Sequence, residues 1–77
     1  MKATNSIKDI FLKLDAKRKD EVRKKISDKY NVSIGTVNNY WIYDGEIPDK
    51  NRAGVLRIVK GVAQLQVKEI QKLIDVV

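Results

Sequence analysis

The sequence contains no cysteine and no histidine. Without cysteine the protein has no disulfide and no thiolate ligand, and without histidine it lacks the commonest metal ligand and general base. We therefore expect no metal, no cofactor and no enzymatic activity. Long apolar runs are absent from the N-terminal segment, where lysines at positions 2, 8 and 13 interrupt any run of signal-peptide length. We expect a soluble, cytoplasmic protein.

Basic residues outnumber acidic ones by sixteen to ten, which gives this chain of 77 residues a net charge of +6 and a pI near 9.7. A chain of this length forms one domain, and a basic domain attracts polyanions, either nucleic acid or an acidic membrane surface. The alternative is that the lysines only keep a small protein soluble. Basic residues cluster at positions 17–19 and 23–25. Because the start of a helix disfavours cations, this cluster at the start of a predicted helix favours polyanion binding.

The apolar residues recur at spacings of three and four in five segments, and no segment alternates over the length of a strand. We predict an all-α, compact five-helix domain spanning residues 1–77, with helices over residues 7–14, 18–29, 34–43, 50–60 and 64–75. Ser6 is the expected N-cap of the first helix, and Gly61 is expected to end the fourth. The predicted core positions are Ile7, Ile10, Phe11, Leu14, Val22, Ile26, Tyr30, Val37, Tyr40, Trp41, Ala53, Val55, Leu56 and Val59.

One side of the last predicted helix carries Ile70, Leu73, Ile74 and Val77. This apolar side either completes the core or provides a dimer face, and the sequence leaves both alternatives open.

Residues 23–42 are predicted to form two helices joined by a tight turn at Tyr30-Asn31-Val32-Ser33. Asn31 can adopt the left-handed conformation that ends a helix, and Ser33 can cap the next helix. Two helices joined by so short a turn must cross steeply. The second of them is rich in polar residues and has no charge, which is typical of a helix that reads the DNA major groove.

The first helix of this pair contains a small residue, Ser27, and the turn contains Asn31. The apolar positions around them are Tyr30, Val32, Val37 and Tyr40, and Gly45 and Pro48 follow the second helix. With these residues the chain resembles the lambda-repressor and Cro-like helix-turn-helix DNA-binding domains from residue 22 to about residue 64. Asn31 stands where the family usually has glycine, and Ser27 where it usually has alanine. The resemblance implies sequence-specific binding of double-stranded DNA by a small transcriptional regulator, a repressor of prokaryotic, phage or mobile-element type, with a homodimer as the usual bound form.

In that arrangement the helix over residues 33–43 lies in the major groove, with its N-terminal residues nearest the bases. The expected base-reading residues are Ile34, Gly35, Asn38 and Asn39. We expect most from Asn39, because a side-chain amide can pair with adenine through two hydrogen bonds. The expected phosphate contacts are Ser33, Lys17, Arg18, Lys19, Arg23, Lys24, Tyr43, Lys50 and Arg52. For Asn38, Asn39 and the residues at 50–52 the alternative is an ordinary solvated surface.

A second hypothesis is a protein-interaction module that keeps the helix-turn-helix shape, such as an antitoxin-like or anti-repressor partner. Interaction surfaces usually present aromatic or apolar anchors, whereas the predicted exposed side of the 34–43 helix is Asn, Ser and Gly. DNA is therefore the expected partner, and we expect neither a membrane nor a small-molecule substrate.

Overall fold

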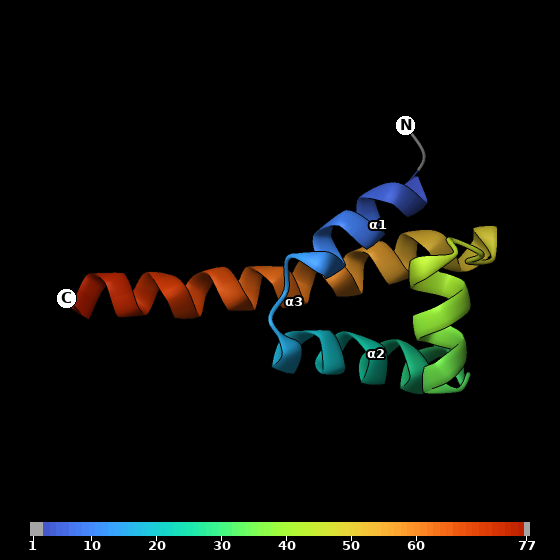
Figure 1. Cartoon of the computed structure of the whole chain (residues 1–77), viewed down its shortest axis with the longest axis horizontal. Helices are drawn as coiled ribbons and strands as arrows, with labels where there is room; N and C mark the ends of the chain where they lie inside the picture. Colours follow the sequence, from blue (N-terminus) through green and yellow to red (C-terminus); the bar gives the residue numbers. More distant parts are fainter. Residues whose placement is uncertain (1–2, 77) are drawn as a thin grey trace.

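The computed structural model describes residues 3–76, with side chains from Ile7 to Ile74, and this part of the chain is all helical (Figure 1). The helices are α1 (Ala3–Leu12), α2 (Ala16–Tyr30), η1 (Thr36–Tyr43) and α3 (Asp49–Val76). Within these described residues the all-α prediction is confirmed and no strand occurs. No helix between residues 3 and 76 has both the length and the apolar character needed to cross a membrane.

The fourth and fifth predicted helices are a single helix, so the prediction of five helices is wrong. α3 runs without a break through Gly61, whose φ is not positive, whereas Asn31 and Gly45 do have positive φ. A glycine inside a helix costs about 1 kcal/mol relative to alanine. Val59 and Val62 on either side of Gly61 are both buried in the core. Burial of this continuous face outweighs the weak local propensity of one glycine.

The first predicted helix also differs at its start. α1 begins at Ala3, so Ser6 lies within the helix and is not its N-cap. α2 begins at Ala16, two residues before the predicted start, and the Asp15 carboxylate caps it by accepting a hydrogen bond from the Arg18 backbone N–H at 2.8 Å. This cap fixes the start of the first helix of the predicted pair.

The core lies where α1, α2 and η1 meet the N-terminal half of α3 (Figure 1). Most of the predicted core positions are confirmed as buried or packed against it, and Ala53 is the exception on α3, since it is exposed. The fully or nearly fully buried apolar residues are Ile7, Phe11, Leu14, Val22, Ile26, Val37, Trp41, Ile42, Ile47, Val55, Val59 and Val62.

The helix after the turn is wider than an α-helix. After one helical turn from Ile34, η1 is a π-helix, and the Asp44 backbone N–H bonds to the Asn39 carbonyl five residues earlier, at 3.2 Å. Because a π-helix has more residues per turn than an α-helix, Val37 and Ile42 both turn toward the core. Both are buried, whereas Tyr40 is 55% exposed. The assignment of Tyr40 to the core is therefore wrong, because it assumed a period of 3.6 residues.

Candidate nucleic-acid interface

The turn between α2 and η1 is closed by hydrogen bonds on both sides. Asn31 has φ 55° and ψ 49°, the left-handed conformation predicted for it. The Ser27 hydroxyl donates to the Val32 carbonyl at 2.5 Å, and the Val32 N–H donates to the Ser27 carbonyl at 3.2 Å. The Ser33 hydroxyl oxygen accepts the Thr36 N–H at 3.1 Å, so its predicted capping role is confirmed. The two helices cross steeply as a result (Figure 1).

An aromatic pair holds the crossing angle. The rings of Tyr30 and Trp41 meet edge to face with centroids 5.7 Å apart, and the Tyr30 hydroxyl donates to the Asn51 carbonyl of α3 at 3.5 Å. This hydroxyl occupies the space where a side chain at Gly54 would lie, since a Cβ there would stand 1.9 Å from it. Gly54 thus permits the close approach of α2 to α3, and Tyr30 joins three helices at one point.

Three of the four predicted base-reading residues are open to solvent, two of them just before η1 and one within it. Ile34 is 51% exposed, Asn39 is exposed, and a side chain at Gly35 would meet only the Ser33 hydroxyl, at 4.0 Å. Gly35 therefore allows close approach of a ligand to the backbone.

The fourth residue, Asn38, is half-buried and engaged within the protein. Its Oδ1 accepts a hydrogen bond from Arg23 Nε at 3.0 Å, and its Nδ2 donates to Asn39 Oδ1 at 3.1 Å. Arg23 is held in turn by Asp20 at 2.6 Å and lies over the Phe11 ring, 5.2 Å from its centroid. The structure brings Arg23, Asn38 and Asn39 into one chain of contacts that orients the exposed amide of Asn39.

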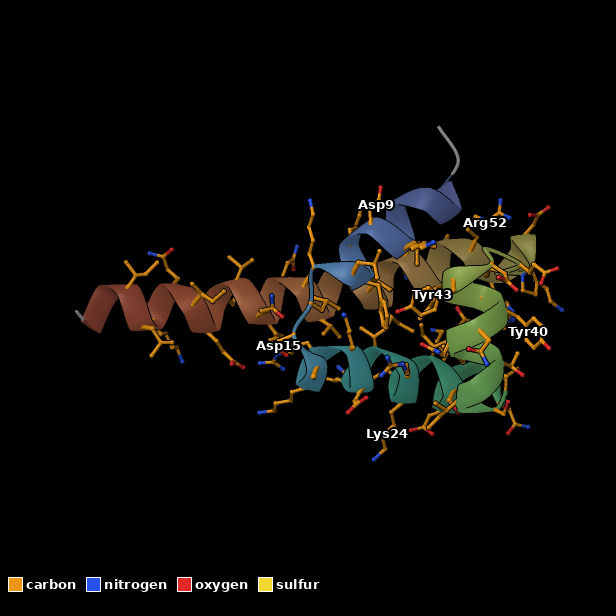
Figure 2. All side chains as sticks on the ribbon, viewed as in Figure 1. Asp9, Asp15, Lys24, Tyr40, Tyr43 and Arg52 are labelled. Carbon is orange, nitrogen blue, oxygen red and sulfur yellow. The ribbon has the colours of Figure 1, made fainter. Side chains whose placement is uncertain are left out.

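Six of the nine predicted phosphate contacts fall into two groups, and the other three are arginines with partners within the protein. Ser33, Lys17, Lys24 and Lys50 are exposed, and Figure 2 shows the Lys24 side chain pointing away from the body of the protein. Lys19 and Tyr43 lie around Phe11 instead. Lys19 Nζ is 5.8 Å from the Phe11 centroid, and the Tyr43 ring packs edge to face on Phe11 at 6.1 Å. Tyr43 is still 40% exposed, and Lys8 Nζ lies 5.7 Å from its centroid.

Arg18 is placed differently from the prediction. It is 7% exposed and pairs with Glu21 at 2.7 Å and with Glu69 of α3. Hydrogen bonding to the Arg18 guanidinium holds the pKa of the Glu21 carboxyl below its ordinary value, and Lys25 lowers it further, although burial opposes both effects. Arg18 therefore links α2 to α3 and is not available to a phosphate, which corrects its assignment. A local sequence pattern gives no sign of this pairing, because Glu69 is far away along the chain.

Arg52 also has partners within the protein. Its guanidinium pairs with Asp49 at 3.1 Å and donates to the Ile47 carbonyl at 3.4 Å, while its buried Nε has no hydrogen-bond partner among the described residues. Arg52 thus braces the loop before α3. Lys50, which is exposed beside it, is the better candidate for a phosphate contact.

The sequence pattern places Tyr40 in the core and so gives no indication that its side chain is exposed beside Asn39. Figure 2 shows its ring pointing outward from η1, away from α1, whereas Tyr43 points toward α1. No local signal marks η1 as a π-helix, and with a period of 3.6 residues Tyr40 is indistinguishable from a core residue.

Among the described residues no group of acidic side chains is arranged to hold a metal ion.

No protein-family model matches this chain, and comparison with curated proteins and with solved structures gave no significant match. The functional argument therefore rests on the geometry and charge of the α2–η1 surface.

Proposed function

We propose that the protein binds double-stranded DNA sequence-specifically through η1 and acts as a small transcriptional regulator, a repressor of lambda-repressor-like fold. The observation that carries the proposal is an exposed polar start of η1, held at a steep angle to a basic α2. Residues 30–43 contain no charged side chain, in a chain of which 34% is charged. Lysines 17 and 24 are exposed on α2 and Lys50 is exposed beyond the other end of η1. Exposed lysine side chains therefore lie on both sides of the uncharged residues 30–43.

Asn39 reads a base in this proposal, and Asn38 positions it. The Asn39 Oδ1 accepts one bond from Asn38 and keeps a second lone pair, and its NH₂ group remains a donor. One donor and one acceptor are what the major-groove edge of adenine requires. Gly35 lets the η1 backbone come close, and Ile34 packs against a thymine methyl group. The Tyr40 hydroxyl donates to a phosphate at the rim of the groove.

The first experiment is selection of bound duplexes from a random DNA library at about 0.15 M salt, near physiological ionic strength. Enrichment of a defined sequence supports the proposal. Asn39→Ala is expected to relax the preference at one base pair, a loss of roughly 1–3 kcal/mol of discrimination. Gln64→Ala, which removes an exposed amide on α3, is the matched control and leaves the preference unchanged. Selection of the same sequences by the Asn39 variant would remove the role proposed for that residue.

The salt dependence of the binding affinity distinguishes the loss of a phosphate contact from the loss of a base contact. With about six phosphate contacts, the affinity falls with salt at a log–log slope near five. Lys24→Ala weakens binding to all duplexes alike and lowers this slope by about one. Lys60→Ala, an exposed lysine of α3, is the control for the loss of one charge and has a much smaller effect.

A protein partner is the second candidate, and one observation favours it: Ile34, just before η1, and Tyr40, on η1, are both more than half exposed. Such residues can anchor a protein interface. This observation weakens the sequence-based argument that η1 lacks anchors. An apolar protein contact would hardly respond to salt, so folded protein that enriches no DNA sequence would favour an antitoxin-like or anti-repressor role.

A further inference from the structure

The C-terminal part of α3 extends well past α1 and α2 and exposes apolar side chains (Figure 1). Ile70 is 49% exposed, Leu73 is 69% exposed and Ile74 is 61% exposed. The alternative that this side completes the core is therefore wrong for these residues, and Val77, the fourth member of the predicted face, lies outside the described residues. Residues 64–77 carry two lysines and two acidic residues, so charge selects no partner for this part of the helix.

A more specific feature lies nearer the start of α3, where an open hollow of about 450 Å³ follows the helix. Val55, Val59 and Val62 of this segment are buried in the core, and the hollow lies on the opposite side of the helix. Over three turns, or about 16 Å, the lining residues recur at spacings of three and four and so share one face. They are Ala53, Leu56, Arg57, Lys60, Gly61 and Gln64.

Gly61 has no reason within the described protein to be glycine. Its φ is not positive, and a Cβ at this position would meet nothing within 4 Å. Gly54 differs, because the Tyr30 hydroxyl occupies the space that its side chain would need. A glycine inside a helix destabilises it relative to alanine. An exposed helical glycine without an internal contact is best explained by a molecule that approaches the backbone from outside.

Charge indicates the chemistry of that molecule. Residues 50–68 contain five basic residues and no acidic one. Arg57 and Lys60, which line the hollow, are exposed and have no ion pair among the described residues. Exposed charges on a helix usually interact with opposite charges three or four positions away, whereas these two cations have only each other at that spacing. The hollow is therefore complementary to carboxylates supplied from outside.

The rest of the lining favours a protein helix over a nucleic acid. Leu56 is half-buried and packs against the core, and Ala53, which the sequence predicts as a core residue, is exposed in the same hollow. A nucleic-acid backbone is bound by polar and charged groups, whereas an apolar strip beside cations suits a helix with one apolar and one acidic side. Without a side chain at Gly61, two helix axes can approach to about 8 Å.

We propose that an acidic amphipathic helix of a partner protein docks on α3 along residues 53–64. Its carboxylates pair with Arg57 and Lys60, its apolar side chains cover Leu56, and its backbone crosses α3 at Gly61. The contact involves one helix on each side and is small, so we expect a dissociation constant of roughly 1–100 µM. η1 contributes no residue to the hollow, and the inference does not depend on DNA binding.

The test begins with selection of helical peptides of about 15 residues, roughly four turns, from a library with random residues on one face. The target is the full native chain, and fluorescence anisotropy measures the affinity of the enriched peptides. We expect peptides with Asp or Glu beside apolar residues at spacings of three and four and with dissociation constants below about 100 µM. Replacing their acidic residues by glutamine is expected to weaken binding about 10-fold, as for two or three exposed ion pairs.

Variants of the chain locate the binding site. Gly61→Gln is expected to raise the dissociation constant at least about 10-fold, because the new side chain fills the place of closest approach. Glutamine favours a helix relative to glycine, so this variant stays folded. Arg57→Gln with Lys60→Gln is expected to abolish the preference for an acidic peptide over its glutamine version. The control is Lys24→Gln, which removes an exposed lysine of α2 and leaves peptide binding unchanged.

Selection of no peptide with a dissociation constant below about 100 µM would overturn the proposal. Enriched peptides that lack acidic residues, or that bind the Gly61 variant as tightly as the native chain, would overturn it as well. Loss of duplex binding by the Arg57 and Lys60 double variant would assign the hollow to nucleic acid instead. Failure of the native chain to select DNA would leave the peptide affinities as they are, so the two proposals fail separately.

Discussion

Replacing Gly54 by alanine is expected to destabilise the protein, although alanine is the better helix former. Alanine inside α3 favours the helix by about 1 kcal/mol. Its Cβ, however, would stand 1.9 Å from the Tyr30 hydroxyl oxygen and 3.3 Å from Tyr30 Cζ. The Tyr30 side chain must move, and in moving it weakens its ring contact with Trp41 and its hydrogen bond to the Asn51 carbonyl. Overfilling a packed site typically costs about 1–3 kcal/mol, so the free energy of unfolding falls by about 1 kcal/mol in net terms.

Gly61 provides the matched control, because it lies in the same helix and a Cβ there would meet nothing within 4 Å. Gly61→Ala is therefore expected to raise the free energy of unfolding by about 1 kcal/mol. The two alanine variants then differ by about 2 kcal/mol, which is roughly 8–16 °C in Tm for a domain of this size. Urea and thermal denaturation followed by far-UV circular dichroism measure both.

Tyr30→Phe removes the hydroxyl oxygen, which is the atom nearest to a Cβ built at Gly54. In the Tyr30→Phe background this Cβ meets the ring edge at 3.3 Å and Lys29 Cε at 3.9 Å, so Gly54→Ala is expected to become neutral or stabilising. Equal stabilisation by Gly54→Ala and Gly61→Ala in the native background would refute the reasoning about the Tyr30 contact. Destabilisation by Gly61→Ala would refute the continuity of α3, because alanine is unfavourable only if Gly61 ends a helix in the left-handed conformation.

Three further predictions address the turn, the register of η1 and the paired Arg18. Asn31→Gly is expected to be neutral or slightly stabilising and Asn31→Ala to cost about 1–2 kcal/mol in urea denaturation, because φ at this residue is 55°; equal stabilities would contradict the left-handed conformation. Ile42→Ala is expected to lower the free energy of unfolding by about 2–5 kcal/mol and Tyr40→Ala by less than about 1 kcal/mol, since Ile42 is 1% and Tyr40 55% exposed. A larger loss for Tyr40→Ala than for Ile42→Ala would indicate an α-helical register. Glu21→Gln is expected to lower stability at pH 7. Because the pKa of Glu21 is lowered in the folded state, the native chain should lose its stability advantage over the variant as pH falls from the ordinary pKa of 4.5 through the folded pKa. A difference between the two Tm values that does not change with pH would count against the ion pair with Arg18.

The α2–η1 surface shows how far sequence reasoning reaches at a candidate site. The turn at Asn31 and the cap at Ser33 were predictable, because both depend on groups within a few residues of each other. The exposure of Asn39 was predictable as well, from its place opposite Val37. The engagement of Asn38 by Arg23 was not, because that contact depends on how two helices cross, which no local pattern encodes.

The sequence by itself determined that the chain is helical, where the turn between α2 and η1 lies, and which apolar residues form much of the core. These properties depend on short-range periodicity, on capping groups and on burial preference. The charge pattern, with its basic α2 and neutral C-terminal segment, was also readable from the sequence alone.

Only the tertiary structure decided three features that matter for function. The five-residue spacing of Val37 and Ile42 in η1, and with it the exposure of Tyr40, depends on how η1 packs against the other helices. The continuity of α3 through Gly61 depends on burial of Val59 and Val62 on both sides. The pairing of Arg18 with a glutamate of α3 joins residues 51 positions apart. In each case contacts between distant segments outweigh a local preference of about 1 kcal/mol, which is the size of most helix propensities.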